Sequence, residues 1–191
     1  LYDRQPPHDI PAEIATLGAM ILDAVCIADV VAIISDSSAF YKQSHAVIFN
    51  AIVAAYDANN SVDLVMLNAW LSDRGLIEQV GGVEYLVELV ESVPSSDTVE
   101  YYARRVRDKW LSRQIIATAA NMLDTAYTQQ DKPVEDLLDE SETAIFQIAR
   151  NRVTDRSDLK LGDHLQAHYE QLAARAGESL VGLPTGFYDI D

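Results

Sequence analysis

The chain contains 191 residues, of which 49% are hydrophobic, enough to bury the core of one domain or of one domain with an appendage. Its 30 acidic and 14 basic side chains give a net charge of −16, which argues against DNA binding by most of the surface, because phosphate backbones are bound through clustered Lys and Arg. The sequence has no apolar run of the roughly 18 residues that a membrane span needs, no signal-peptide core at its start and a single cysteine, a combination typical of a cytoplasmic protein without membrane contact.

Residues 1–95 have the pattern of a compact bundle of short helices. Pro11 suits the first turn of a helix, and apolar residues then recur at spacings of three and four up to Leu22. Residues 25–34 are nearly all apolar, which predicts a second, buried helix. Three further helices are predicted from their start and stop signals: one ending at Asn59-Asn60, one capped by Asp63 and closed by Gly75, and one after Gly81-Gly82. No stretch here alternates as a strand does, so the predicted fold class is all-α.

Residues 96–150 predict a long helical hairpin. Asp97 and Glu100 have the spacing of a capping box, and helical periodicity continues without Gly or Pro to about Tyr127. Pro133 is placed for the first position of the return helix. The two arms can face each other along a seam of roughly heptad spacing. Apolar residues off that seam would stay uncovered, which predicts contact with another subunit or partner; these residues are Trp110, Ile116, Leu123 and Phe146.

Basic side chains gather on one face of the first arm, where Arg105, Lys109 and Arg113 are spaced by four. Such a stripe could contact nucleic acid or could pair with nearby acids or a neighbouring subunit. Residues 1–99 contain only three basic side chains, so the surroundings are acidic. We therefore favour ion pairing.

Residues 151–179 predict a linker that contains one short helix. Its apolar stripe consists of Leu165, Tyr169, Leu172 and Ala176. A single amphipathic helix of this length is marginal in water, so we interpret it as a docking element for a partner surface. Residues 180–191, with Gly182, Pro184 and Gly186, read as the start of a further domain. Any catalysis by the parent protein is expected to lie beyond Asp191.

Catalytic chemistry is scarce in this sequence. A phosphate-binding P-loop needs Gly-Lys followed by Ser or Thr, and none of the four lysines follows a glycine. His164 and His168 have the spacing of zinc ligands on a helix, but the Glu that a metalloprotease needs after the first His is replaced by Leu165, which favours solvated linker histidines. His45 precedes an apolar run, which favours a structural role at a helix terminus. We predict no catalytic residue, no metal site and no cofactor in this chain.

Several motifs occur in a fixed order along the chain. The first motifs are DRQPPHDIPAE at residues 3–13 and LGAMIL at 17–22, followed by Phe40-Tyr41 with His45 and Ile48-Phe49. The middle motifs are Asp63 before Leu67 and Leu71, and GLIE at 75–78 before Gly81-Gly82 and Tyr85-Leu86. The last are Tyr102 with Arg113, and GLPTGF at 182–187 before Asp189 and Asp191. In order and spacing these motifs resemble bacterial replicative DNA helicases of the DnaB family. The resemblance covers essentially the whole chain.

The resemblance implies a parent protein that forms a ring-shaped hexamer and unwinds DNA at the replication fork with ATP and Mg. The amino-terminal domains would form a collar on the ATPase ring. The hairpins would pair between subunits and help recruit primase and the helicase loader. The linker helix would pack on the neighbouring ATPase domain. DNA would be bound only through the RecA-like ATPase domain, whose ATP and DNA sites would follow Asp191.

A second interpretation is a stand-alone acidic helical adaptor with the same fold and no ATPase. The sequence after Asp191 distinguishes the two, because a Gly-x-x-x-x-Gly-Lys-Ser/Thr motif there would indicate the helicase.

Overall fold

The computed structural model describes residues 5–93, 95–129 and 133–151. They belong to the first of two units into which the chain divides, residues 1–154 and 155–191. All regular secondary structure in the described residues is helical, which confirms the predicted all-α class. The elements are α1 (Ile10–Leu22), η1 (Ala24–Cys26), α2 (Ile27–Ile33), η2 (Ser37–Ala39), α3 (Gln43–Asn59), α4 (Leu64–Asp73), α5 (Gly82–Glu91), α6 (Val99–Thr128) and α7 (Val134–Asn151).

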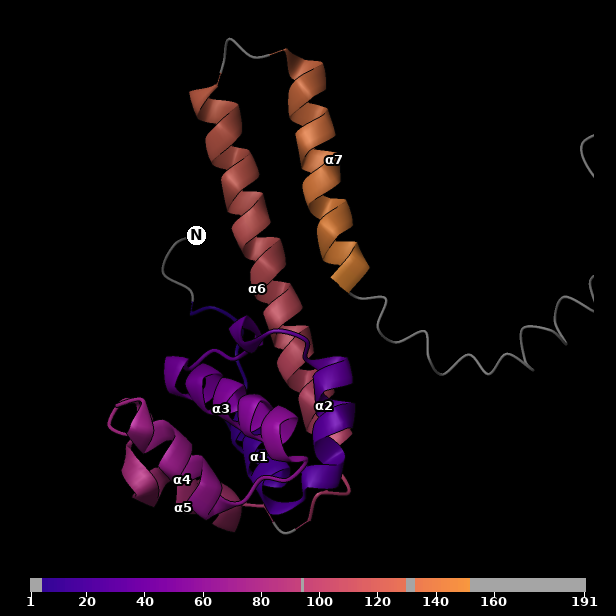
Figure 1. Ribbon diagram of the computed structural model, residues 1–191. Coiled ribbons are helices and arrows are strands. Elements are labelled where there is room, and N and C mark those ends of the chain that lie inside the picture. The colour runs from indigo at the N-terminus through magenta and orange to yellow at the C-terminus, as the bar shows by residue number, and fades with distance from the viewer. Residues whose placement is uncertain (1–4, 94, 130–132, 152–191) are drawn as a thin grey trace, which may run out of the picture. The chain divides into compact units, whose positions relative to one another are not determined.

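We call α1 to α5, together with α6 as far as Arg107, the head. Within it α1 packs against α3, α5 and α6, so the first helix of the chain lies at the centre of the core (Figure 1). The largest core side chains are fully buried and come from α1 to α5, including Leu17, Ile52, Leu67 and Leu89. The head therefore has a hydrophobic core of its own.

Local signals set the helix boundaries of the head much as the sequence predicts. The Asp9 carboxylate accepts the Ala12 N–H at 3.1 Å and caps α1, and the Asp63 carboxylate accepts the Met66 N–H at 2.7 Å and caps α4. Asn60 ends α3 in the left-handed region, with φ 52°. Gly81 adopts φ 95° directly before α5, a conformation in which a side chain would be strained.

Gly18 allows α1 and α5 to approach each other closely. A Cβ at this position would lie 2.1 Å from the Leu89 carbonyl oxygen, far inside van der Waals contact. The two backbones therefore touch where they cross, and only glycine fits there.

Two local predictions are wrong. Residues 25–34 do not form one buried helix: the Asp23 carboxylate caps the short η1 turn by accepting the Val25 N–H, α2 follows, and Val25 is 80% exposed. The capping box at Asp97 does not form either, because that carboxylate accepts the Ser95 hydroxyl and Thr98 precedes the helix without a side-chain cap.

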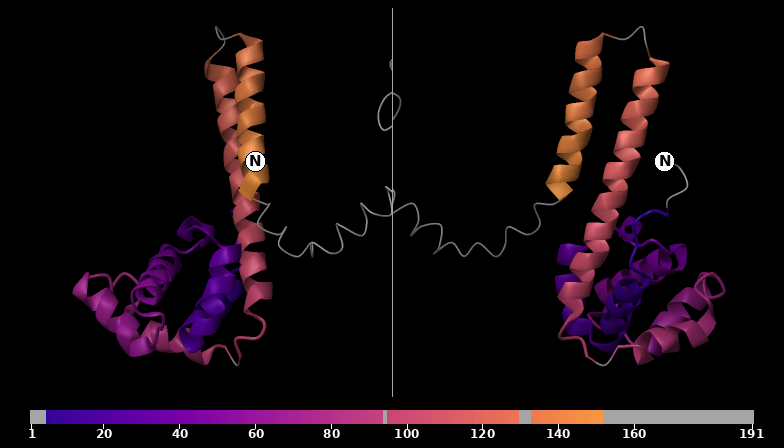
Figure 2. Two further views of the ribbon diagram at one scale, coloured as in Figure 1. Left: turned by 45° about the vertical axis from the view of Figure 1, so that its right-hand side comes forward. Right: turned by 180° about the vertical axis from the view of Figure 1, so that it is seen from behind.

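The hairpin consists of α6 from Ile115 onward together with α7. Figures 1 and 2 show α6 continuing past the head as one uninterrupted helix, with α7 returning beside it. Pro133 directly precedes α7, as predicted. One helix thus belongs to both the head and the hairpin.

Candidate functional site

For its length, the hairpin exposes more large apolar side chains than the head. Eight of the described large apolar side chains between residues 115 and 146 have at least half of their surface in water. They are Ile115, Ile116, Leu123, Tyr127, Val134, Leu138, Ile145 and Phe146. Contiguous exposed apolar surface of this kind marks an interaction site in a natural protein.

Two grooves flank the line along which α6 and α7 meet. One, of about 430 Å³, is lined almost entirely by apolar residues, including Leu111, Ile115, Met122, Ile145 and Ile148. The other, of about 370 Å³, includes the polar residues Asn121, Thr125, Glu140, Ser141 and Gln147. The hairpin therefore has an apolar side and a polar side.

Helix geometry places the other exposed apolar residues on the apolar side. Successive residues of an α-helix are rotated by about 100°, so Ile116 and Leu123 lie about 60° and 40° from Ala119, which lines the apolar groove. On α7, Leu138 lies about 20° from Ile145, and Phe146 about 60° from Ala149. We call this surface the apolar face; it comprises Ile115, Ile116, Leu123, Leu138, Ile145 and Phe146.

The four residues predicted as uncovered do not share one location. Ile116, Leu123 and Phe146 are exposed and lie on the apolar face. Trp110 instead packs, partly buried, against the core of the head. The apolar pattern of α6 runs from head to hairpin without a break, so the sequence could not show where contact with the head ends. An interface role for these residues stays a prediction.

The predicted docking helix lies outside the described residues. This applies to Leu165, Tyr169, Leu172 and Ala176, to the histidine pair His164 and His168, and to residues 180–191.

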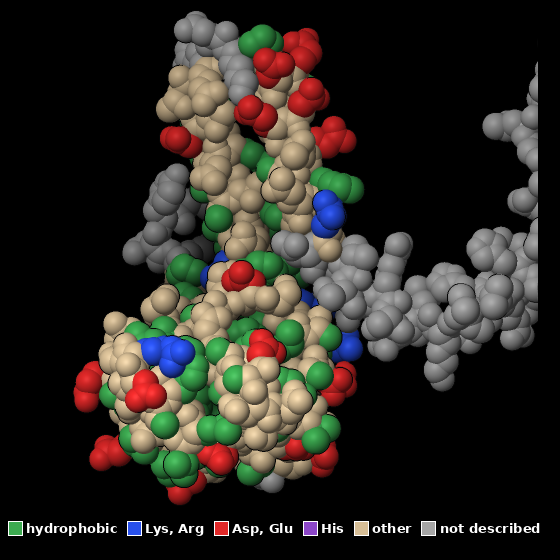
Figure 3. Space-filling view, in the orientation of Figure 1, with side chains coloured by type: hydrophobic (Ala, Val, Ile, Leu, Met, Phe, Trp, Pro, Cys, Tyr) green, Lys and Arg blue, Asp and Glu red, His purple; other side chains and the backbone are tan. Residues whose placement is uncertain are grey.

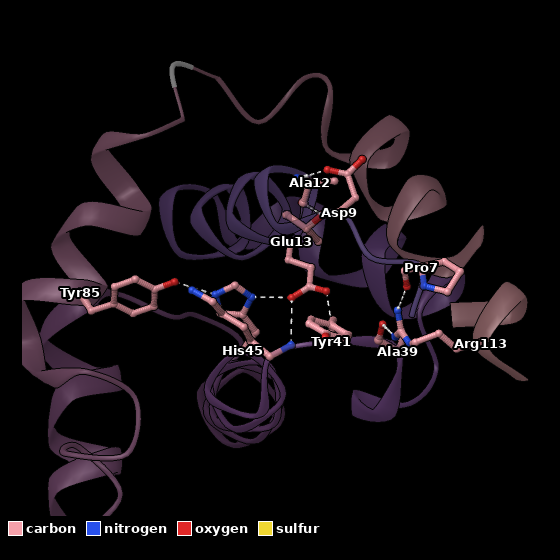
Figure 4. Close-up of polar contacts among 11 residues, drawn as sticks. Pro7, Asp9, Ala12, Glu13, Ala39, Tyr41, His45, Tyr85 and Arg113 are labelled. Carbon is pink, nitrogen blue, oxygen red and sulfur yellow. Dashed lines mark hydrogen bonds and ion pairs between the residues drawn. The ribbon is translucent and has the colours of Figure 1, made fainter. Parts of the chain in front are cut away.

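A buried polar network joins three helices of the head, and the sequence alone did not reveal it. The Glu13 carboxylate accepts the Tyr41 N–H at 2.7 Å and lies 2.6 Å from His45 Nδ1. His45 Nε2 lies 2.7 Å from the Tyr85 hydroxyl (Figure 4). Glu13 also accepts the N–H of Lys42, the N-cap of α3, so its carboxylate lies at the helix end that favours anions. These contacts connect α1, α3 and α5. Because Glu13 and His45 are 1% and 0% exposed, a substrate cannot reach their side chains.

A second polar cluster fastens the start of the chain to α6. The Arg113 guanidinium donates to the Pro7 carbonyl at 2.8 Å and to the Ala39 carbonyl at 2.6 Å (Figure 4). Two turns earlier on α6, Arg105 Nε and Nη2 donate to the Asp9 carboxylate at 2.8 and 2.6 Å. Burial raises the pKa of Asp9, but the hydrogen bonds from Arg105 and from the Ala12 N–H outweigh it, so the pKa is lowered overall.

These contacts bear on the basic stripe. Arg105, a member of the stripe, forms an ion pair with Asp9. The favoured interpretation, ion pairing, is confirmed for Arg105, whereas Arg113 binds main-chain carbonyls. Figure 3 shows acidic side chains over α7 and few basic ones on the same side of the molecule.

The described residues offer little reactive chemistry. Among them, no three His, Cys, Asp or Glu side chains are grouped as a metal site would require. Burial, with the nearby Asp23 and Asp29 carboxylates, raises the pKa of the Cys26 thiol to about 11, so it is a poor nucleophile. No single helix in the described part of the chain has the length and apolarity to cross a membrane; one bent pair, Ile10–Leu22 with Ala24–Ile33, meets those two criteria together.

Comparison with known families identifies the head. Residues 5–108, which span the head, match the family model of the DnaB-like helicase N-terminal domain. The chain belongs to this family. The family assignment confirms the resemblance that the ordered motifs indicate.

Relatives of this DnaB-like chain are longer proteins. It is 40% identical over 196 aligned residues to the replicative DNA helicase DnaC of Bacillus subtilis, covering 100% of this chain and 42% of that protein. It is 36% identical to the replicative DNA helicase DnaB of Geobacillus stearothermophilus, covering 99% of this chain and 41% of the relative. The chain thus spans about two fifths of the length of these relatives.

Solved structures share the fold. The N-terminal domain of DnaB helicase from Mycobacterium tuberculosis has a TM-score of 0.70 and 31% identity, with 75% of this chain and 99% of that chain covered. A DnaB-like replicative helicase whose structure was described together with its interactions with primase has a TM-score of 0.72 at 22% identity, covering 96% of this chain and 39% of that one.

Proposed function

We propose that this chain is the amino-terminal collar and linker of a hexameric, ATP-dependent replicative DNA helicase, and that its role is assembly and recruitment. Family membership and the names of the relatives support the helicase assignment. The observation that carries the assembly role is the apolar face of the hairpin.

A second copy of the chain is the occupant that fits the apolar face. Burying a Leu, Ile or Phe side chain contributes roughly 1.5–3 kcal/mol, and α6 and α7 expose several such side chains on one side. A hairpin of two helices cannot cover this side itself. Pairing hairpin against hairpin lets each copy cover the other, as a closed symmetric contact does.

Recruitment follows from the same geometry. The hairpin extends beyond the head, so part of its surface stays accessible after pairing. We propose that primase and the helicase loader bind there; a structurally similar helicase has been described with primase, which supports the first of these partners.

The parent protein would be the enzyme. ATP and Mg would be bound by a RecA-like domain that begins at about residues 180–191, and DNA would be contacted only through that domain. Residues 1–95, 96–150 and 151–179 would be the globular part, the hairpin and the linker, with Leu165, Tyr169, Leu172 and Ala176 docking on a neighbouring ATPase domain. The parent would act in the cytoplasm.

The assembly role is tested by the mass of the protein in solution. One chain has a mass of 21.1 kDa, so we expect light scattering to give at least twice that value. Phe146→Asp places a charge on the apolar face, where an unpaired charge is costly to bury. It is expected to return the mass to that of one chain at the same concentration, with unchanged helical circular dichroism.

The matched control is Gln147→Asp. Gln147 is exposed on α7, lines the polar groove and lies about 160° around the helix from Ile145. This variant should keep the mass of the unsubstituted chain. An unchanged mass in Phe146→Asp would remove the apolar face as the assembly surface.

A further inference from the structure

The last hydrogen bonds that α6 makes to the head, in the described residues, involve the start of the chain. Val106 and Arg107 are buried in the head, and Trp110 packs on its edge. Arg113, one turn further, reaches two segments that are distant in sequence, at Pro7 and Ala39. The helix then continues into the hairpin, where Ile115 and Ile116 are exposed.

Stacked rings reinforce this contact. The His8 ring stacks on Tyr41 with centroids 4.4 Å apart and an angle of 15° between the planes. The Arg113 guanidinium lies 5.7 Å from the centroid of the same Tyr41 ring. The Tyr41 N–H donates to the buried Glu13 carboxylate, so the stack is anchored to the core network.

From these contacts we propose that residues 7–9 and the arginines Arg105 and Arg113 form a brace, which fixes the direction in which α6 leaves the head. Asp9 caps α1 and pairs with Arg105, and Arg113 binds the carbonyls of Pro7 and Ala39. The arginines are positioning residues that act through these contacts.

The guanidinium of Arg113 suits this role because of its shape. It is planar and rigid, and it donates to two carbonyls at once, which a lysine ammonium on a flexible stem cannot do with the same geometry. Long helices bend sharply at Pro, at Gly/Ser pairs or at inserted groups, and α6 contains neither Gly nor Pro. We therefore treat α6 as one rod whose direction is set by its contacts with the head, and the brace lies between its packed and its exposed parts.

Small changes of direction are amplified along the helix. At a rise of 1.5 Å per residue, Asp124 lies about 16 Å beyond Arg113, so a 10° tilt moves it by about 3 Å. The consequence for the collar rests on the proposed function: the brace sets where the apolar face is presented to a second copy.

Distances between spin labels test the brace. Val65→Cys on α4 and Asp124→Cys on α6 supply two exposed attachment points. The native Cys26 is buried and should stay unlabelled. Labelled protein is diluted into an excess of unlabelled protein, so that only distances within one chain are measured by pulsed electron resonance.

The decisive variant is Arg113→Met, which removes the guanidinium and keeps an unbranched side chain. We expect the distance distribution to shift or broaden by about 3 Å or more. The control is Arg150→Met, an exposed arginine in the last turn of α7; its distribution should match the unsubstituted chain. If Arg113→Met gives the same distribution as the control, the brace does not set the direction of α6.

A second variant keeps the proposal testable if Arg113→Met fails to fold. If Arg113→Met does not fold, the pair Asp9→Asn with Arg105→Met is judged by the same criterion; Asn keeps the capping role of Asp9. The mass of each sample is measured in parallel. Changed distances in a monomeric protein would uphold the brace and contradict the proposed self-association, whereas unchanged distances in a dimer would do the reverse.

Discussion

The head and the hairpin solve the problem of burying apolar side chains in different ways. In the head, Leu17 and Leu89 are fully enclosed by neighbouring helices of the same chain, and even the polar Glu13 is buried with its partners. In the hairpin, Ile145 and Phe146 are 58% and 62% exposed. The head covers most of its large apolar side chains within one chain, whereas the apolar face of the hairpin stays exposed. Because α6 belongs to both, the difference lies in what surrounds a helix and not in the helix.

The largest expected difference between the two regions is in the free energy of unfolding after a leucine in each is replaced by alanine. Leu17→Ala should lower the free energy of unfolding of the head by about 2–5 kcal/mol, because it removes buried methyl groups and leaves a cavity. Leu138→Ala, on the apolar face, should change it by less than about 0.5 kcal/mol at low protein concentration. Both tryptophans, Trp70 and Trp110, pack against the head core, so urea unfolding followed by their fluorescence reports on the head. Equal effects of the two substitutions would contradict the distinction between the regions.

A substitution in the buried network of the head should lower its stability by a smaller amount, and a nearby exposed glutamate supplies the control. Glu13→Gln keeps the shape of the side chain but replaces one acceptor oxygen by a donor group, which would face the N–H groups and the His45 ring. Leaving buried groups unsatisfied costs about 1–3 kcal/mol. Glu88→Gln on the exposed side of α5 should stay within about 0.5 kcal/mol of the unsubstituted chain. Thermal unfolding measures both, and a neutral Glu13→Gln would show that the network does not stabilise the head.

The smallest expected effect is the acid sensitivity of the brace. The pKa of Asp9 is lowered from 3.8 in the folded chain, so its contribution to stability is complete above pH ~4 and is lost as the pH falls through the folded-state pKa. Asp9→Asn removes this dependence while keeping the cap. We expect its stability to fall less between pH 5 and 3 than that of the unsubstituted chain, by under about 1 kcal/mol. Parallel pH curves for the two proteins would contradict an ion pair at Asp9.

Short-range signals predicted the helices well, because each boundary depends on residues next to it. Asp63, Asn60 and Pro133 act within one turn of their own positions. The same reasoning failed at Asp97, where a neighbouring serine competes for the carboxylate. A local pattern indicates which hydrogen bonds a side chain can form. Which of them forms depends on competing donors and acceptors nearby.

Contacts between segments that are distant in the chain could not be predicted from the sequence. Glu13, His45 and Tyr85 come from three helices, and nothing in their spacing announces a network. Trp110 and Ile116 both read as surplus apolar residues of one helix, yet only the first contacts the head. Where a helix leaves a core depends on the packing of other elements, so a periodic pattern along α6 could not show it.

Amide hydrogen exchange at two protein concentrations tests the central claim directly. If a second copy covers the apolar face, amides of residues 115–128 and 134–150 should be protected at high concentration and exchange faster after dilution, whereas amides in α1, α3 and α5 should keep the same protection. Protection of the hairpin that does not change with concentration would show that the hairpin is stable without another copy and would contradict the account.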